Sequence, residues 1–165
     1  MRFLRYFLWI VDLDGTLNDD RWRLDKYRGD PRDSKSWTEY HNHWNDDQMV
    51  PQTQALVESI PVMDRLVFVS LRHQTHNGDT FDHLQHFFGE RSFDLYLYDD
   101  DYTKEEDFWR RVVNLRGEIK ERKRRNEDVL HGGTLLVDDS DWRVPIARDI
   151  LGDVVHLKVG LSGRE

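Results

Sequence analysis

The chain contains no cysteine among its 165 residues. Disulfide bonds and thiolate nucleophiles are therefore excluded, and a reducing compartment is compatible with the sequence. Only four prolines interrupt the chain, and no apolar run approaches the roughly 18 residues that a membrane-spanning helix needs. The basic, apolar start lacks a small-residue cleavage site and continues directly into Asp12. We therefore expect a cytoplasmic protein that makes no membrane contact.

Positive charge is also scarce, since 32 acidic residues outnumber 24 lysines and arginines. The net charge of −8 argues against tight non-specific binding to long nucleic acids, but it permits recognition of a strand end. The G-x-x-x-x-G-K-[ST] motif of P-loop kinases does not occur. A chain of this length normally forms one domain, and we expect a single domain over 1–165.

The most informative segment is an apolar run that ends abruptly in two carboxylates. Residues 7–11 are typical of a buried strand in a parallel sheet, and the string D-L-D-G-T-L follows at 12–17. Ligands of open α/β sheets bind at the carboxyl ends of such strands. The glycine and threonine of this string can turn the chain and offer N–H groups and a hydroxyl to an anion. Asp12 and Asp14 are therefore candidate catalytic residues; the alternative is an ordinary Asp-Gly turn.

Hydrophobic periodicity predicts the remaining elements. We expect strands at 66–70, 95–98, 134–137 and 154–159, and helices at 51–60, at 80–88, from about 103, and at 144–151. Strands that alternate with helices predict a doubly wound, Rossmann-like parallel sheet of the α/β class, with helices on both faces. The polar and aromatic residues at about 18–50 are expected to form a small insertion after the first strand.

Polar residues of distinct kinds follow three of the predicted strands. They are Asp12 and Asp14, then Ser70 and Arg72, and then Asp138 and Asp139. Carboxylates are hard oxygen ligands of the kind that Mg²⁺ takes, together with water and substrate phosphate. Two acidic strand ends therefore predict a Mg²⁺ site. For the second acidic pair taken alone, the alternative is a solvated turn.

Taken in order, these signatures resemble those of the haloacid dehalogenase superfamily of phosphohydrolases. Within it, the sequence is most similar to the 3′-phosphatase domain of phage polynucleotide kinase-phosphatases. The stretch at 104–109 is similar to the K-E-E-x-F-W segment of that domain, Asp100 falls on an acidic position, and Arg23 lies where the domain has an essential arginine. The resemblance covers nearly the whole chain and implies a sheet of the haloacid dehalogenase type.

The resemblance also implies a role for each matched residue. Asp12 would be the nucleophile that forms an aspartyl-phosphate, and Asp14 the general acid and then the base. Mg²⁺ would be held by Asp12, by the backbone carbonyl of Asp14, and by Asp138 and Asp139, with Asp139 in the more direct contact. The other implied roles are phosphate binding by Ser70 and Lys104, further phosphate contacts from Arg23 and Arg72, and positioning of a basic partner or water by Asp100.

The implied activity is that of a Mg²⁺-dependent phosphomonoesterase that removes 3′-phosphates from nucleic acid ends before repair or ligation. Its substrate would be such an end or a nucleotide, and a kinase or ligase would be a separate partner. One alternative is a 5′-nucleotidase or small-metabolite phosphatase with the same machinery. Another is a noncatalytic phosphate-binding module, because Leu71 follows Ser70 where the superfamily usually has glycine.

Three further features have alternative interpretations. The basic run at 116–125 is either a nucleic-acid contact or a solvated helix. The aromatic residues of the insertion either stack an unpaired base or pack the insertion against the sheet. The eight histidines include pairs with metal-ligand spacing, for which we expect structural or solvated roles because carboxylates already provide a metal site.

Overall fold

A computed structural model describes residues 4–98, 129–141 and 143–159 of the chain. Five parallel strands form the central sheet in the order β5-β4-β1-β6-β7. Their bounds are Leu4–Asp12 for β1, Arg65–His73 for β4, Asp94–Tyr98 for β5, Val129–Asp138 for β6 and Val154–Lys158 for β7. The predicted α/β fold with a parallel sheet is confirmed, and the strand order is compatible with a Rossmann-like fold.

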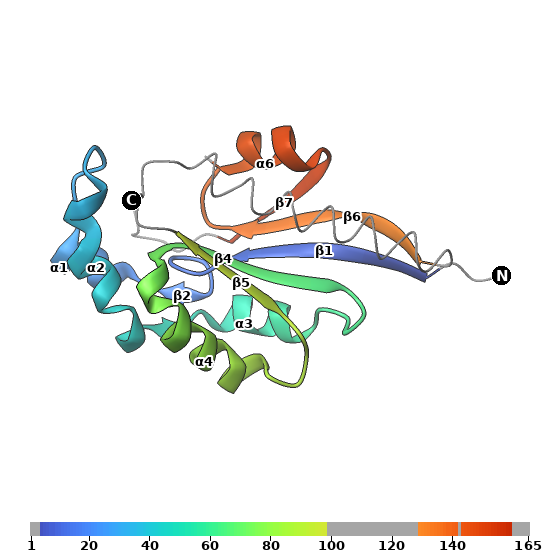
Figure 1. The fold of residues 1–165 in the computed structure, drawn as a ribbon, viewed down its shortest axis with the longest axis horizontal. Helices are drawn as coiled ribbons and strands as arrows, with labels where there is room; N and C mark the ends of the chain where they lie inside the picture. The colour runs from blue at the N-terminus through green and yellow to red at the C-terminus, as the bar shows by residue number, and fades with distance from the viewer. Residues whose placement is uncertain (1–3, 99–128, 142, 160–165) are drawn as a thin grey trace.

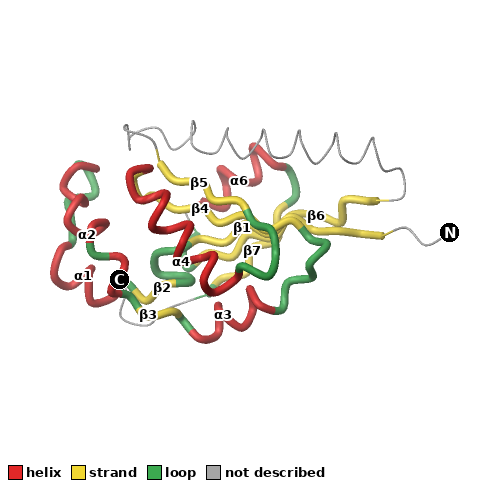
Figure 2. Tube along the Cα trace, turned by 60° about the horizontal axis from the view of Figure 1, so that its bottom comes forward, coloured by secondary structure: helices red, strands yellow, loops and turns green. Residues whose placement is uncertain are grey.

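The helices cover both faces of this sheet, with α6 opposite α3 and α4 (Figures 1 and 2). Their bounds are Pro51–Glu58 for α3, Asn77–Phe88 for α4 and Arg143–Leu151 for α6. Pro51 begins α3, in keeping with the fixed backbone angle that suits proline to a first helical turn. These helices lie close to their predicted positions, whereas the helix expected from about 103 lies outside the described residues.

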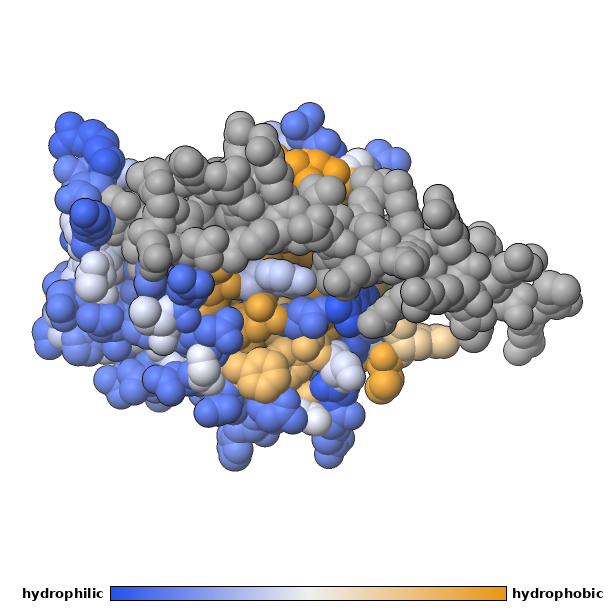
Figure 3. Space-filling view, viewed as in Figure 1, coloured by the Kyte–Doolittle hydropathy of each residue, from blue (hydrophilic) through white to orange (hydrophobic). Residues whose placement is uncertain are grey.

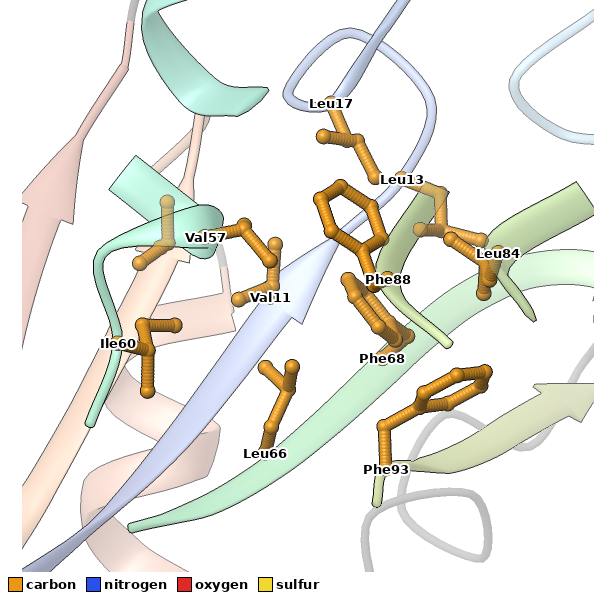
Figure 4. Close-up of a cluster of buried hydrophobic side chains, with 11 residues drawn as sticks. Val11, Leu13, Leu17, Val57, Ile60, Leu66, Phe68, Leu84, Phe88 and Phe93 are labelled. Atoms are coloured by element: carbon orange, nitrogen blue, oxygen red, sulfur yellow. The ribbon is translucent and has the colours of Figure 1, made fainter. Parts of the chain in front are cut away.

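The central strand β1 is apolar on both faces because each face packs into a separate core. Leu8 and Ile10 pack with residues of β4, β6 and α6. Val11 joins the other core, in which the Phe68 ring stacks on Phe88 at 5.7 Å between centroids (Figure 4). A strand buried on both sides has no polar face, and this explains the continuous apolar run in the sequence.

The chain between β1 and α3 forms a compact segment that we call the insertion, residues 18–50. At its base β2 (Asn18–Asp19) pairs with β3 (Gln48–Met49) in an antiparallel ladder. Two short helices, α1 (Arg21–Tyr27) and α2 (Thr38–Asn42), stand between these strands. Figure 1 shows α1 and α2 at the end of the sheet toward which β1 points. The insertion therefore lies beside the carboxyl ends of the strands, where open α/β sheets bind ligands.

Hydrophilic side chains cover the insertion at the left of the space-filling view (Figure 3). Apolar side chains reach the surface nearer the middle of the same face. Among the helices that the structure describes, none has both the length and the apolar character that a membrane span requires.

Candidate active site

The candidate site lies where the order of the strands reverses. The chain adds β4 and β5 on one side of β1 and then crosses to add β6 and β7 on the other. Val11 is in register with Phe68 of β4 and with Val137 of β6, so the three strands end at the same edge. Such a switch point is the usual ligand site of an open α/β sheet. The predicted site residues from all three strand ends therefore come together.

A tight turn after β1 arranges the first of these residues. The Leu13 carbonyl accepts hydrogen bonds from the backbone N–H groups of Thr16, Leu17 and Asn18 at 2.9–3.1 Å. Gly15 has a φ of 83°, a left-handed conformation that glycine adopts without steric cost. The turn brings Thr16 Oγ1 to 2.9 Å from Asp12 Oδ2, and the same oxygen accepts the Asp139 N–H at 3.0 Å. Thr16 thus joins the ends of β1 and β6.

Asp12, Asp138 and Asp139 form an acidic cluster at this junction. Each offers a carboxylate oxygen within 4.8 Å of the other two, and Asp12 and Asp138 are buried. Burial raises the pKa of Asp12 well above its usual range; Arg143 opposes the rise, and the neighbouring carboxylates add to it. A divalent cation would relieve this repulsion, and three carboxylates are ligands that Mg²⁺ accepts. The donor set therefore fits the predicted metal.

This cluster is the one group of three or more ligand residues close enough to share a metal ion among the residues that the structure describes, and it contains no histidine. None of the histidine pairs with metal-ligand spacing belongs to such a group of three there.

Asp14 lies in the opposite electrostatic environment. Its Oδ1 accepts hydrogen bonds from Arg23 Nη2 and Arg72 Nη2, both at 2.7 Å, and Ser70 Oγ donates to Oδ2 at 3.2 Å. Burial opposes ionisation, but Arg72 and Arg23 outweigh it and hold the pKa of Asp14 well below its usual range. The side chain is therefore an ionised carboxylate in this arrangement, and the two arginines expected to contact phosphate are bound to it.

Aromatic rings from the insertion hold the two guanidiniums in place. Arg72 lies over the Trp44 ring at 4.4 Å, and Arg23 lies over the Tyr40 ring at 4.3 Å. Arg23 also forms an ion pair with Asp47, whose side chain is fully buried. Cation–π contacts of this kind strengthen when they are desolvated. Trp44 and Tyr40 therefore pack within the protein. This is one of the two interpretations that the sequence allowed for the aromatic residues of the insertion.

Three other aromatic rings of the insertion form a surface cluster: Trp22, Tyr27 and His43. The rings of Tyr27 and His43 are stacked at 4.4 Å, and Trp22, which is 37% exposed, meets both edge to face. Trp22 Nε1 donates to Asp47 Oδ1 at 2.8 Å, and the same oxygen accepts from Arg23 Nε at 2.8 Å. One carboxylate therefore links the surface cluster to an arginine of the site.

The sequence interpretation missed Arg143 and Asp47. Arg143 is the first residue of α6, where the helix dipole disfavours a cation. That unfavourable placement is a signal in the sequence that anionic groups lie nearby. Asp47 gives no comparable signal, because its pairing with Arg23 depends on the path by which the insertion returns to β3.

Two predicted site residues, Lys104 and Asp100, lie outside the described residues, as does the basic run at 116–125. Their expected roles stay predictions.

His41, buried within the insertion, is expected to make the stability of the fold depend on pH. Burial lowers its pKa to about 4 from the ordinary 6.5, and the nearby Arg72 and Arg23 contribute, although Asp14 opposes them. Between these two values the unfolded chain binds more protons, so the free energy of unfolding falls as the pH falls. We expect wild-type protein to lose about 2 kcal/mol from this residue between pH 7.5 and pH 5.

Urea unfolding of wild-type and His41→Gln protein at both pH values measures this loss. The variant should lack it, whereas His86→Gln, at an exposed position on α4, should keep the wild-type dependence. An identical pH dependence for wild-type and His41→Gln protein would show that His41 is not the group responsible.

No protein-family model matches the sequence, and no curated protein matches it. Among solved structures, the chain is similar to one in "Structure of Pnkp1/Rnl/Hen1 complex", with a TM-score of 0.54 and 19% identity over 93% of this chain and 46% of that one. A second match, in "Structure of the Pnkp1/Rnl/Hen1 RNA repair complex", has a TM-score of 0.53 and 18% identity over 94% and 42%. The chain spans less than half the length of these proteins. It therefore shares its fold with part of a protein found in an RNA repair complex.

Proposed function

We propose that this chain is a Mg²⁺-dependent phosphomonoesterase of the haloacid dehalogenase type that removes 3′-phosphates from nucleic acid ends. The observation that carries the proposal is the contrast between Asp12 and Asp14. The first lies in an acidic cluster suited to a cation, and the second is bound by two arginines. The pKa values of these two carboxyl groups are shifted in opposite directions, as in known catalytic pairs. A cation beside Asp12 would lower its raised pKa so that it can act as a nucleophile, and a phosphate that shares the arginines would raise the low pKa of Asp14 so that it can act as an acid.

In the proposed reaction Asp12 is the nucleophile. Asp12, Asp138 and Asp139 would hold Mg²⁺, together with the Asp14 carbonyl, and the bound cation would screen the cluster from an incoming phosphate. An oxygen of Asp12 attacks phosphorus, the bond from phosphorus to the 3′-oxygen breaks, and an aspartyl-phosphate forms. Water then hydrolyses this intermediate to release inorganic phosphate and restore Asp12.

Asp14 is the proposed acid for the first step and the base for the second. To protonate the leaving 3′-oxygen it must first gain a proton, yet Arg23 and Arg72 oppose this. Both arginines are planar donors that suit a phosphoryl group. A phosphate bound beside them would share their N–H groups and weaken the contacts that hold the pKa of Asp14 down. Substrate binding and protonation of Asp14 are therefore coupled in this proposal.

Two observations support a nucleic acid end as the substrate. The fold is shared with part of a protein in an RNA repair complex. The surface cluster of Trp22, Tyr27 and His43, in which Trp22 is the exposed ring, also lies one carboxylate away from Arg23, where a base next to a bound phosphate can stack. Because the similar chains come from a complex of several proteins, we also propose that any kinase or ligase is a separate partner.

The position of Leu71 argues against a noncatalytic module. Its side chain packs against the core beneath α6, together with Leu8 and Ile10. Because the Leu71 side chain packs against the core, its bulk does not need to obstruct the proposed phosphate site. The 5′-nucleotidase alternative uses the same catalytic groups, so only the choice of substrate separates it from the proposed function.

The decisive experiment compares phosphate release from matched oligonucleotides that carry a 3′- or a 5′-phosphate and from the corresponding mononucleotides. Each reaction is run with Mg²⁺ and with a chelator. Metal-dependent release confined to 3′-ends is the expected result. Faster release from mononucleotides would favour the nucleotidase, and no release from any substrate would contradict phosphatase activity.

The aromatic cluster gives a sharper test of the substrate. We expect Trp22→Ala to lower kcat/KM about tenfold on an oligonucleotide whose 3′-phosphorylated residue carries a base, which is the effect of roughly 1.4 kcal/mol of stacking. On an otherwise identical oligonucleotide with an abasic terminal residue, wild-type and variant protein should differ much less. Phe87→Ala removes a similarly exposed ring from α4 and should change neither rate. An equal loss on both substrates would show that Trp22 acts only by holding Asp47.

A further inference from the structure

The acidic cluster already contains a cation that belongs to the protein. Arg143 Nη1 lies 2.7 Å from Asp12 Oδ1 and 2.8 Å from Asp138 Oδ2, and the side chain is 5% exposed. One guanidinium nitrogen therefore bridges the two buried carboxylates that, with Asp139, are close enough to share a metal ion. Arg143 is thus placed where it must affect the binding of a divalent cation.

Nothing in α6 itself favours this position for an arginine. The first turn of a helix carries partial positive charge, and a buried guanidinium has lost its hydration. The acidic cluster must compensate for both costs. The helix cannot easily move away, because Val144, Ala147 and Leu151 anchor it in the core against β1 and β6. The guanidinium is therefore held within reach of the cluster by the packing of α6.

We propose that Arg143 is a built-in counter-ion that competes with the divalent metal for Asp12 and Asp138. Without metal, its charge offsets their repulsion and preserves the geometry of the strand ends. When a divalent cation binds, the guanidinium gives up these oxygens or shares them with a like charge, so the metal binds more weakly than the three carboxylates alone would allow. The inference rests on the proposed metal site but does not depend on the substrate.

Metal affinity can be measured without any substrate, by calorimetric titration of chelator-treated protein with Mn²⁺ as the probe. We expect Arg143→Met, which keeps an unbranched apolar stem and removes the charge, to lower the dissociation constant for Mn²⁺ at least tenfold. Arg148→Met, at an exposed position of the same helix, should leave it within twofold of wild type. Unchanged or weaker Mn²⁺ binding by Arg143→Met would overturn the proposal, since it would make Arg143 neutral or helpful to the metal.

Thermal unfolding provides a second measurement. With chelator, Arg143→Met should unfold at a lower temperature than wild type, and saturating Mn²⁺ should raise its Tm by more than it raises that of wild type. If this variant does not fold, Arg143→Gln, which keeps hydrogen-bond donors without the charge, is titrated in its place with the same expected tightening. An equal rise in Tm for wild type and variant would also overturn the proposal. Phosphate release is scored separately, so tighter Mn²⁺ binding in a protein that hydrolyses nothing would refute the proposed function alone.

Discussion

Replacing Asp12 with asparagine is expected to lower the rate of phosphate release by at least about 10⁴-fold, on the scale seen when other enzymes lose their nucleophile. An amide nitrogen cannot attack phosphorus as a carboxylate does, and the amide oxygen is a poorer metal ligand. The fold should survive, because Arg143 keeps Asp138 as its buried counter-ion and the amide keeps an oxygen for Thr16. Steady-state kinetics and circular dichroism on the same preparation measure both properties.

Asp141→Asn is the matched control for this substitution. Asp141 lies close in sequence to the acidic cluster but is exposed and pairs with Lys158 at the surface. Its rate of phosphate release should stay within about twofold of wild type, because surface ion pairs contribute little. Near-wild-type turnover by Asp12→Asn would rule out the aspartyl-phosphate mechanism.

The largest loss of stability is expected from Arg23→Met. The guanidinium is fully buried between Asp14 and Asp47, and its removal leaves buried Asp47 without its cation and Asp14 with Arg72 alone. Breaking a buried ion pair on one side typically costs about 3–5 kcal/mol, because the remaining charge cannot be hydrated. We therefore expect the free energy of unfolding, measured with urea at pH 7.5, to fall by about that amount.

Two companion variants separate this effect from a general loss of charge. Arg21→Met removes a half-exposed arginine two residues away that pairs with Asp19, and it should change the free energy by less than about 0.5 kcal/mol. Adding Asp47→Asn to Arg23→Met should recover part of the lost stability, since it removes the charge that the first substitution leaves without its cation. If Arg23→Met and Arg21→Met have equal effects, the buried network does not stabilise the fold.

The sheet was predictable because its strands are buried on both faces. The apolar run before Asp12 and the shorter runs near Val67 and Leu136 are each long enough to fill a parallel strand and each stop at a polar residue. The residues at which each strand begins and ends were less predictable. β4 continues to His73 because a register shift after Ser70 lets His73 pair with Tyr98, and no pattern in the sequence marks such an irregularity.

The sequence identified the residues of the candidate site better than it identified the contacts between them. Strand ends and a turn motif indicated Asp12, Asp14 and Asp138, which the structure does bring to one edge. The side chains that these carboxylates contact depend on how the insertion and α6 pack. The sequence could not show that Arg23 and Arg72 both bind Asp14, since that requires the insertion to fold back over the end of the sheet. The same folding decides which aromatic rings become buried.

The crossing from β5 to β6 has a consequence for the chain as it is synthesised. β1 is made first, yet its partner along one whole edge is β6, with Val11 beside Val137. At roughly 5–20 residues per second, the chain between them takes on the order of ten seconds to emerge. Throughout that interval one apolar edge of β1 has no neighbouring strand and can pair with another nascent chain. The segment that covers this edge also delivers Asp138 and Asp139, so a ribosome that stalls before it releases a product that is prone to aggregate and that lacks two of the three residues of the acidic cluster.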